Sequence, residues 1–188
     1  VDYLANKLLP TADIQCILPI GEDPPEWNPS AELVSSLQQV DAIIANGAGF
    51  EKWMETASLP QSKIIYASKG IAQTDLIFLK GETHSHGKKG SHSHAGKDPH
   101  IWSDPILYQQ QASNIANALK KVVPEKSAEI DNNLSVLNEQ LNQLHEKLTE
   151  TTKNLQKVEL AANHPAYNYL AKRYTLNVHS FDFDPEVP

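Results

Sequence analysis

The sequence contains a single cysteine, Cys16, and no apolar run of the about 18 to 20 residues that a helix needs to span a membrane. One cysteine excludes an internal disulfide bond and a zinc site made of cysteines. Positive charge is also scarce, since 16 Lys and Arg face 23 Asp and Glu and leave a formal net charge of −7. This balance argues against nucleic acid or an anionic membrane as a partner, and 40% hydrophobic residues is typical of a globular protein.

The beginning of the sequence lacks an initiating methionine and a signal segment. It opens on Val1, so we expect a mature or shortened form of a longer protein. Its 188 residues are enough for one good hydrophobic core, or for one domain and part of another.

Apolar residues at helical and strand spacing predict an alternation of helices and strands. We expect a short amphipathic helix with Leu4, Leu8 and Leu9 on one side, and a later helix with Ser30 as its N-cap. This alternation predicts an α/β fold with a mainly parallel sheet. The predicted strands are residues 14–18, 42–45, 64–66, 76–79, 158–162 and 177–181.

The strongest periodic signal runs from Glu125 to about Gln156. Its leucines and isoleucine recur at steps of four and three residues, which predicts one long helix with a narrow apolar seam. The pattern leaves two interpretations open: a coiled-coil oligomer, or a single helix packed along its own protein. His145 lies beside this seam and is expected to be exposed. The seam consists of Ile130, Leu134, Leu137, Leu141, Leu144, Leu148 and Leu155.

A His-rich segment, residues 81–97, carries two H-x-H pairs, His84 with His86 and His92 with His94. Its Gly, Ser, Lys and His residues cannot bury enough apolar surface to order it, so we expect a mobile surface loop. Neutral imidazole is a ligand for zinc, copper and nickel, which makes the segment a candidate metal collector. The alternative is a solvated linker or the remnant of a purification tag.

Two other histidines lie in more rigid surroundings. His100 stands in the stretch DPHIWSDP, residues 98–105, just before a predicted helix whose first turn contains Pro105. His164 follows a predicted strand and precedes a helix, which is where open α/β sheets bind their ligands. Both are therefore candidate metal ligands, whereas His179 alternates along a strand and is expected to be structural or exposed.

Two stretches carry weaker signals. The Pro-rich loop at residues 21–29 contains Glu22, Asp23 and Glu26, which either face a cation or are simply solvated. The G-x-G in residues 46–51 lacks the third glycine and the later acidic residue of a nucleotide-binding turn, so we reject nucleotide binding.

Four pieces of the sequence, in order, resemble motifs of the metal-specific solute-binding proteins of bacterial ABC importers, the zinc and manganese group. The third piece matches D-P-H-x-W-x-D-P and is the most specific of the four. Together the pieces cover nearly the whole chain. They are GEDPPEWNPS (residues 21–30), DAIIANGAGFE (residues 41–51), DPHIWSDP (residues 98–105) and NHPAYNYLAKRYTL (residues 163–176).

The resemblance implies two α/β lobes joined by one long backbone helix, with the second lobe incomplete. It resolves the two interpretations of the long helix in favour of the single helix between lobes. The implied division is residues 1–123, which include the His-rich loop 81–97, then the helix 124–157, then the start of a second lobe at 158–188.

The resemblance also implies that His100 from the first lobe and His164 from the second bind the metal. A His-rich insertion before D-P-H-x-W is similar to that of zinc-specific members, so zinc is expected, with manganese or another divalent transition metal as the alternative. The family's first ligand falls on Pro25, which has no donor; a nearby carboxylate, a histidine of the loop or water would replace it. The family's last ligand, which is acidic, falls beyond Pro188.

The function that the resemblance implies is capture of zinc in the cleft between the lobes and its delivery to an ABC permease in the membrane. The protein would be a non-enzymatic monomer, periplasmic or anchored outside the membrane, with His84, His86, His92 and His94 as a weaker, fast-exchanging site. Three alternatives are a metal buffer or chaperone without a permease, a coiled-coil oligomer, and a zinc hydrolase. The hydrolase needs three ligands, a water and a general base, and the sequence has no H-E-x-x-H motif to supply them.

Overall fold

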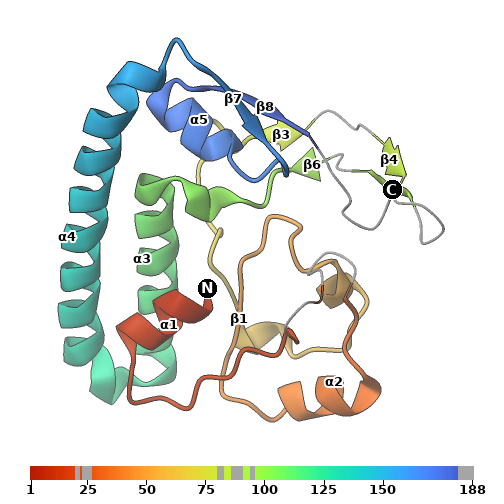
Figure 1. Ribbon diagram of the computed structural model, residues 1–188. Coiled ribbons are helices and arrows are strands. Elements are labelled where there is room, and N and C mark those ends of the chain that lie inside the picture. The colour runs from red at the N-terminus through yellow and green to blue at the C-terminus, as the bar shows by residue number, and fades with distance from the viewer. Residues whose placement is uncertain (20–21, 23–26, 80–82, 86–90, 94–95, 182–188) are drawn as a thin grey trace. The chain divides into compact units, whose positions relative to one another are not determined.

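The computed structural model describes residues 1–19, 22, 27–79, 83–85, 91–93 and 96–181 (Figure 1). The chain divides into two compact units. Unit 1 comprises Val1–Gly70 and Gln109–Glu139, and unit 2 comprises Ile71–Tyr108 and Gln140–Pro188. These ranges differ from the division predicted at residues 123 and 157. In the part of the chain that the structure describes, no helix has the length and apolar character needed to cross a membrane.

Unit 1 contains the first predicted helices and a pair of parallel strands. Helix α1 (Asp2–Leu8) buries Leu4 and Leu8 as predicted. Helix α2 (Ala31–Leu37) begins after Ser30, whose hydroxyl accepts the backbone N–H of Leu33 at 3.2 Å and so acts as the predicted N-cap. Strand β1 (Ile43–Ala45) pairs in parallel with β2 (Ile64–Tyr66), close to the predicted bounds. Their core contains Leu37, Ile43, Ala45, Trp53, Met54 and Leu59, the last three from the segment with the short helices η1 (Lys52–Glu55) and η2 (Gln61–Lys63).

The strand predicted over residues 14–18 is wrong. The structure assigns no regular element there, and Gln15 and Cys16 are exposed. Only Ile17 packs against the core of unit 1. This segment pairs with no described strand in a ladder of hydrogen bonds, and Ile17 attaches it to the core by packing instead.

Two long helices follow, and both were predicted, the first from Pro105 and the second from its periodic apolar seam. Helix α3 (Pro105–Val122) leads through the short η5 (Pro124–Lys126) into α4 (Ser127–Thr152), and η6 (Lys153–Leu155) ends the helical run. Within this one chain Ile130, Leu137 and Leu141 are buried, whereas Val136 and Leu144 are exposed. Three positions of the apolar seam are thus covered by the chain itself, as in the interpretation of a single packed helix, whereas the seam residue Leu144 is exposed.

Unit 2 is built around a strand–helix–strand unit. Strand β7 (Glu159–Ala162) pairs in parallel with β8 (Asn177–Ser180), and α5 (Asn168–Tyr174) connects them (Figure 1). Strand β3 (Phe78–Leu79) pairs antiparallel with β6 (Gly96–Lys97), and a short helix η4 (Ile101–Ser103) precedes α3. Two parallel pairs together with a long helix confirm the predicted mixed α/β class.

The described part of the His-rich segment contains a strand pair that its composition did not predict. Strand β4 (Thr83–Ser85) pairs antiparallel with β5 (Ser91–Ser93), with His84 opposite His92. A backbone ladder needs no apolar side chains for its hydrogen bonds, so composition alone did not exclude it. His86 and His94 lie outside the described residues.

The turn after β1 has its backbone amides already occupied. Gly47 and Gly49 have φ of 77° and 83°, and a Cβ on Gly47 would lie 2.4 Å from the hydroxyl of Ser68. The Glu51 carboxylate accepts the N–H groups of Asn46 at 2.7 Å and of Gly47 at 3.0 Å. The amides that a phosphate would need in a G-x-G turn therefore bind a carboxylate of the same chain. Beside this turn lies a hollow of about 150 Å³.

Burial raises the pKa of Glu51 above its ordinary value of 4.5, and the two backbone hydrogen bonds only partly oppose this. A carboxyl with a raised folded-state pKa holds a proton that the unfolded chain has released. Its stabilising contribution is complete below about pH 4.5 and is lost as the pH rises through the folded-state pKa. We therefore predict that the stability advantage of the wild type over Glu51→Gln decreases as the pH rises above 4.5, by about 1.4 kcal/mol per unit of raised pKa.

Urea unfolding of the two proteins from about pH 4 to 8 measures this difference. The matched control is Glu55→Gln, because Glu55 lies in the neighbouring helix η1 with an exposed side chain. A difference between wild type and Glu51→Gln that does not change with pH contradicts the prediction.

Candidate metal site

The segment that carries His100 is shaped by a buried carboxylate. Asp98 has a relative exposure of 0%, and its Oδ1 accepts the backbone N–H of His100 at 2.9 Å. The same oxygen lies 2.7 Å from Nδ1 of the His100 ring. An aspartate that binds the backbone two residues on forms an Asx turn, and Pro99 between them restricts the backbone further. Asp98 and Pro99 thus hold both the backbone and the ring of His100. The His100 side chain is only 13% exposed.

Helix α5 binds Asp98 from the other side. The Asn168 side-chain amide donates to Asp98 Oδ2 at 2.8 Å, and the Tyr169 hydroxyl donates to the Asp98 carbonyl at 2.9 Å. Tyr169 also accepts the backbone N–H of Ile77 at 3.1 Å. Burial raises the pKa of the Tyr169 hydroxyl, so it stays protonated and remains a donor. Every polar group of the Asp98 side chain is therefore paired, as a buried carboxylate requires.

A second aspartate of the same motif joins α3 to α5. Asp104 Oδ1 accepts the N–H of Ile106 at 2.9 Å, which makes it the N-cap of α3 with Pro105 in the first turn. Its Oδ2 accepts from Nε of Arg173 at 2.8 Å, and a second guanidinium nitrogen also lies at 2.8 Å. This hydrogen bond raises the pKa of Arg173 further above its ordinary value. The two aspartates of D-P-H-x-W-x-D-P thus hold the His100 segment against α5.

His164 lies where β7 ends and before α5 begins, as the sequence predicts, and its side chain is exposed. Its ring centroid is 5.3 Å from that of His100, with the two rings nearly perpendicular at 83°. Two imidazoles that bind one tetrahedral zinc ion through bonds of about 2.0–2.1 Å hold their ring centres about 5 Å apart. The spacing of this pair therefore fits a shared zinc ion.

Both histidines belong to unit 2, whereas the predicted lobes assigned them to different halves of the chain. Among the residues that the structure describes, no cluster of three or more His, Cys, Asp or Glu side chains is arranged to hold a metal ion. Glu22 is described and exposed. Asp23, Pro25 and Glu26 lie outside the described residues, so what replaces the ligand expected at Pro25 stays a prediction.

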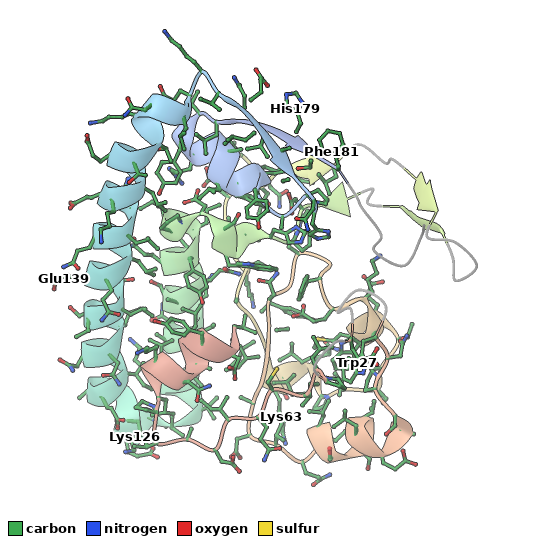
Figure 2. The ribbon with its side chains drawn as sticks, viewed as in Figure 1. Trp27, Lys63, Lys126, Glu139, His179 and Phe181 are labelled. Atoms are coloured by element: carbon green, nitrogen blue, oxygen red, sulfur yellow. The ribbon has the colours of Figure 1, made fainter. Side chains whose placement is uncertain are left out.

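The remaining described histidines lie in other surroundings. The prediction that His145 is merely exposed is wrong, because its Nδ1 lies 3.0 Å from the Tyr174 hydroxyl and the ring is half-buried. Tyr174 itself is buried, which gives His145 a polar partner inside unit 2. His179 on β8 is exposed (Figure 2), and its Nε2 forms a hydrogen bond with Glu159 on the paired strand β7. These contacts of His145 and His179 are with Tyr174 and Glu159, not with His100 or His164.

Sequence reasoning missed the side chains that hold the pair in place. Asp98 and Asp104 stood in a motif singled out for its histidine, and Asn168, Tyr169 and Arg173 stood in another. The signal was present in the spacing, since an aspartate two residues before a histidine suits an Asx turn. The partners on α5 had no such signal, because they lie about 70 residues further along the chain.

Comparison with known proteins places these observations in a family. Residues 2–187 match the family model described as "Zinc-uptake complex component A periplasmic", ZnuA. The chain is 31% identical over 169 residues to the high-affinity zinc uptake system protein ZnuA of Bacillus subtilis, covering 87% of this chain and 52% of that protein. It is 30% identical over 175 residues to the metal ABC transporter substrate-binding lipoprotein SsaB of Streptococcus sanguinis, covering 87% and 53%.

A solved structure has the same fold. The metal-dependent lipoprotein YcdH from Bacillus subtilis superposes with a TM-score of 0.78 at 26% identity, covering 95% of this chain and 62% of that one. The fold is that of the metal-specific solute-binding proteins, the class that the four motifs predicted. The chain belongs to the ZnuA family of periplasmic zinc-uptake components. It spans about half the length of the two relatives described above.

Proposed function

We propose that the protein is the extracytoplasmic zinc-binding component of an ABC metal importer. It captures zinc with His100 and His164 and delivers the ion to a permease in the membrane. The observation that carries this proposal is the 5.3 Å spacing of the two rings, which meet although they are 64 positions apart in the sequence (164 − 100). Zinc here is cargo, and the protein binds and releases it without chemical change.

The surroundings of His100 support a role as ligand. A carboxylate that accepts a hydrogen bond from one ring nitrogen fixes the tautomer and the orientation of the ring and leaves the other nitrogen for the metal. Asp98 is placed to do this at Nδ1, which leaves Nε2 as the donor atom. Zinc is favoured over harder divalent cations because two imidazoles form the described part of the donor set.

The relatives support a proposal for the partner and the location of the protein. Their names describe a zinc uptake protein and an ABC transporter substrate-binding lipoprotein. We propose the same partner, an ABC permease, and a location in the periplasm or anchored outside the membrane. We also propose a monomer, because the apolar seam of α4 at Ile130, Leu137 and Leu141 is buried within one chain.

One observation favours a second function. The motif resemblance puts the family's first metal ligand at Pro25, and proline offers no donor. A zinc ion held by fewer protein donors is released more easily, which suits a metal buffer or chaperone that exchanges zinc without docking on a permease. Growth of a zinc-uptake-deficient bacterium that expresses the protein together with a matching permease separates the two functions, since a buffer does not restore uptake.

We predict that replacing both histidines, His100→Ala with His164→Ala, abolishes the tightest zinc site. Each single substitution removes one of two imidazole donors and should weaken zinc binding at least about tenfold. Isothermal titration calorimetry of the metal-free protein with zinc measures both effects.

The matched control is His145→Ala with His179→Ala, which removes the same number of imidazoles from the same unit. It should leave the tightest site intact. Equal loss of zinc affinity in both double variants, or unchanged tight binding after loss of His100 and His164, would reject the assignment.

The His-rich segment provides a second, weaker set of zinc ligands in this proposal. His84, His86, His92 and His94 supply four imidazoles, and in the backbone register of β4 with β5 the residues His84 and His92 are paired. Exchange at such a set is fast, and it either concentrates zinc near the tight site or reports abundant zinc.

Deleting residues 83–95 should lower the number of zinc ions bound while leaving the fold and the tight site intact. Because Leu79 pairs with Gly96, the deletion leaves residues 80–82 as a three-residue connection between β3 and β6, a common length for a hairpin. Zinc stoichiometry by calorimetry and thermal unfolding of the metal-free protein check the two parts of this prediction.

A full-length control carries Asn in place of all four histidines of the segment. It should show the same reduced stoichiometry as the deletion. An unaltered zinc count in both variants contradicts a metal-binding role for the segment.

A further inference from the structure

One side chain of α5 is bonded to the segments of both candidate ligands. The Asn168 amide nitrogen donates to Asp98 Oδ2 at 2.8 Å and to the carbonyl of Pro165 at 3.3 Å. Asp98 holds the ring of His100, and Pro165 directly follows His164. A single amide group with two N–H donors therefore reaches both segments.

The hydrogen bond from Asn168 to Asp98 affects which ring nitrogen of His100 carries the proton. Asp98 Oδ1 accepts the backbone N–H of His100, and the same oxygen faces Nδ1 of the ring at 2.7 Å. A carboxylate only accepts hydrogen bonds, so a neutral imidazole in this position must carry its proton on Nδ1. The lone pair is then on Nε2, the atom that is free to bind a metal.

The hydrogen bond from Asn168 to the Pro165 carbonyl affects the backbone turn that contains His164. The turn after β7 is closed by the Ala166 N–H, which donates to the carbonyl of His164 at 2.8 Å. The contact from Asn168 to the next carbonyl, that of Pro165, holds this turn against the first residue of α5. His164 is exposed and directly precedes Pro165, so this turn sets the position of its backbone.

We propose that Asn168 is a positioning residue for both metal-binding imidazoles. It fixes the carboxylate of Asp98, which selects the Nδ1–H tautomer of His100 and sets its ring angle, and it fixes the turn that presents His164. The consequence for zinc rests on the proposed function, whereas the consequence for the tautomer does not.

The test compares wild type, Asn168→Ala and the control Asn177→Ala. Asn177 is an exposed asparagine of the same unit, and its amide lies 3.4 Å from the Gln156 carbonyl rather than near Asp98. Long-range ¹H–¹⁵N NMR of the metal-free proteins reports which nitrogen of His100 carries the proton, and calorimetry reports zinc affinity.

In the wild type and in Asn177→Ala we expect Nδ1–H at His100. In Asn168→Ala we expect a mixture that includes Nε2–H, with zinc affinity reduced about 10- to 100-fold, as is typical when the hydrogen-bonded support of a ligand is removed. A merely structural role of Asn168 lowers the melting temperature but leaves the tautomer unchanged. If Asn168→Ala does not fold, Asn168→Ser, whose side chain is too short to span both partners, takes its place.

Two results overturn the inference: Nε2–H at His100 in the wild type, or a folded variant at position 168 that keeps the wild-type tautomer, whatever its zinc affinity. If the tautomer changes in the variant but wild-type protein binds no zinc at this pair, the positioning role stands and the proposed function fails.

Discussion

The candidate site depends on one buried carboxylate, that of Asp98. Its relative exposure is 0%, and a carboxylate at such a position is tolerated only when its oxygens are fully hydrogen-bonded. His100 and Asn168 satisfy the two oxygens, while the backbone of the same residue is tied to Ile77 and Tyr169. Because the Asp98 carboxylate must be hydrogen-bonded, it fixes the backbone at His100, the ring of His100 and the first residue of α5, Asn168.

This arrangement suits a protein that must bind and later release an ion. The two imidazoles are held by the fold in advance, so little ordering is required when the metal arrives. At the same time, the described donor set is small, and the motif resemblance puts the family's first ligand at Pro25, which offers no donor. In the proposed function, zinc affinity therefore depends on a small number of well-positioned groups.

Local patterns in the sequence predicted most of the elements and both candidate ligands. The spacing of Ile130, Leu137 and Leu141 defines one face of a long helix, and short apolar runs mark β1 and β2. Prediction failed where the outcome depended on residues distant in the sequence. Residues 14–18 do not pair with a described strand, and His145 contacts Tyr174 instead of being merely exposed. The network around Asp98 could not be foreseen for the same reason, because Asn168 and Tyr169 reach it from 70 and 71 positions away.

Anomalous diffraction at the zinc absorption edge, from crystals of the protein grown with zinc, tests the central claim most directly. The account predicts one strong peak bound by Nε2 of His100 and by an imidazole nitrogen of His164, each at about 2.0–2.1 Å. The remaining ligands seen around that peak will identify what stands in for the donor missing at Pro25. A well-occupied zinc ion elsewhere, with His100 still bonded to Asp98 and both rings free of metal, would contradict the account.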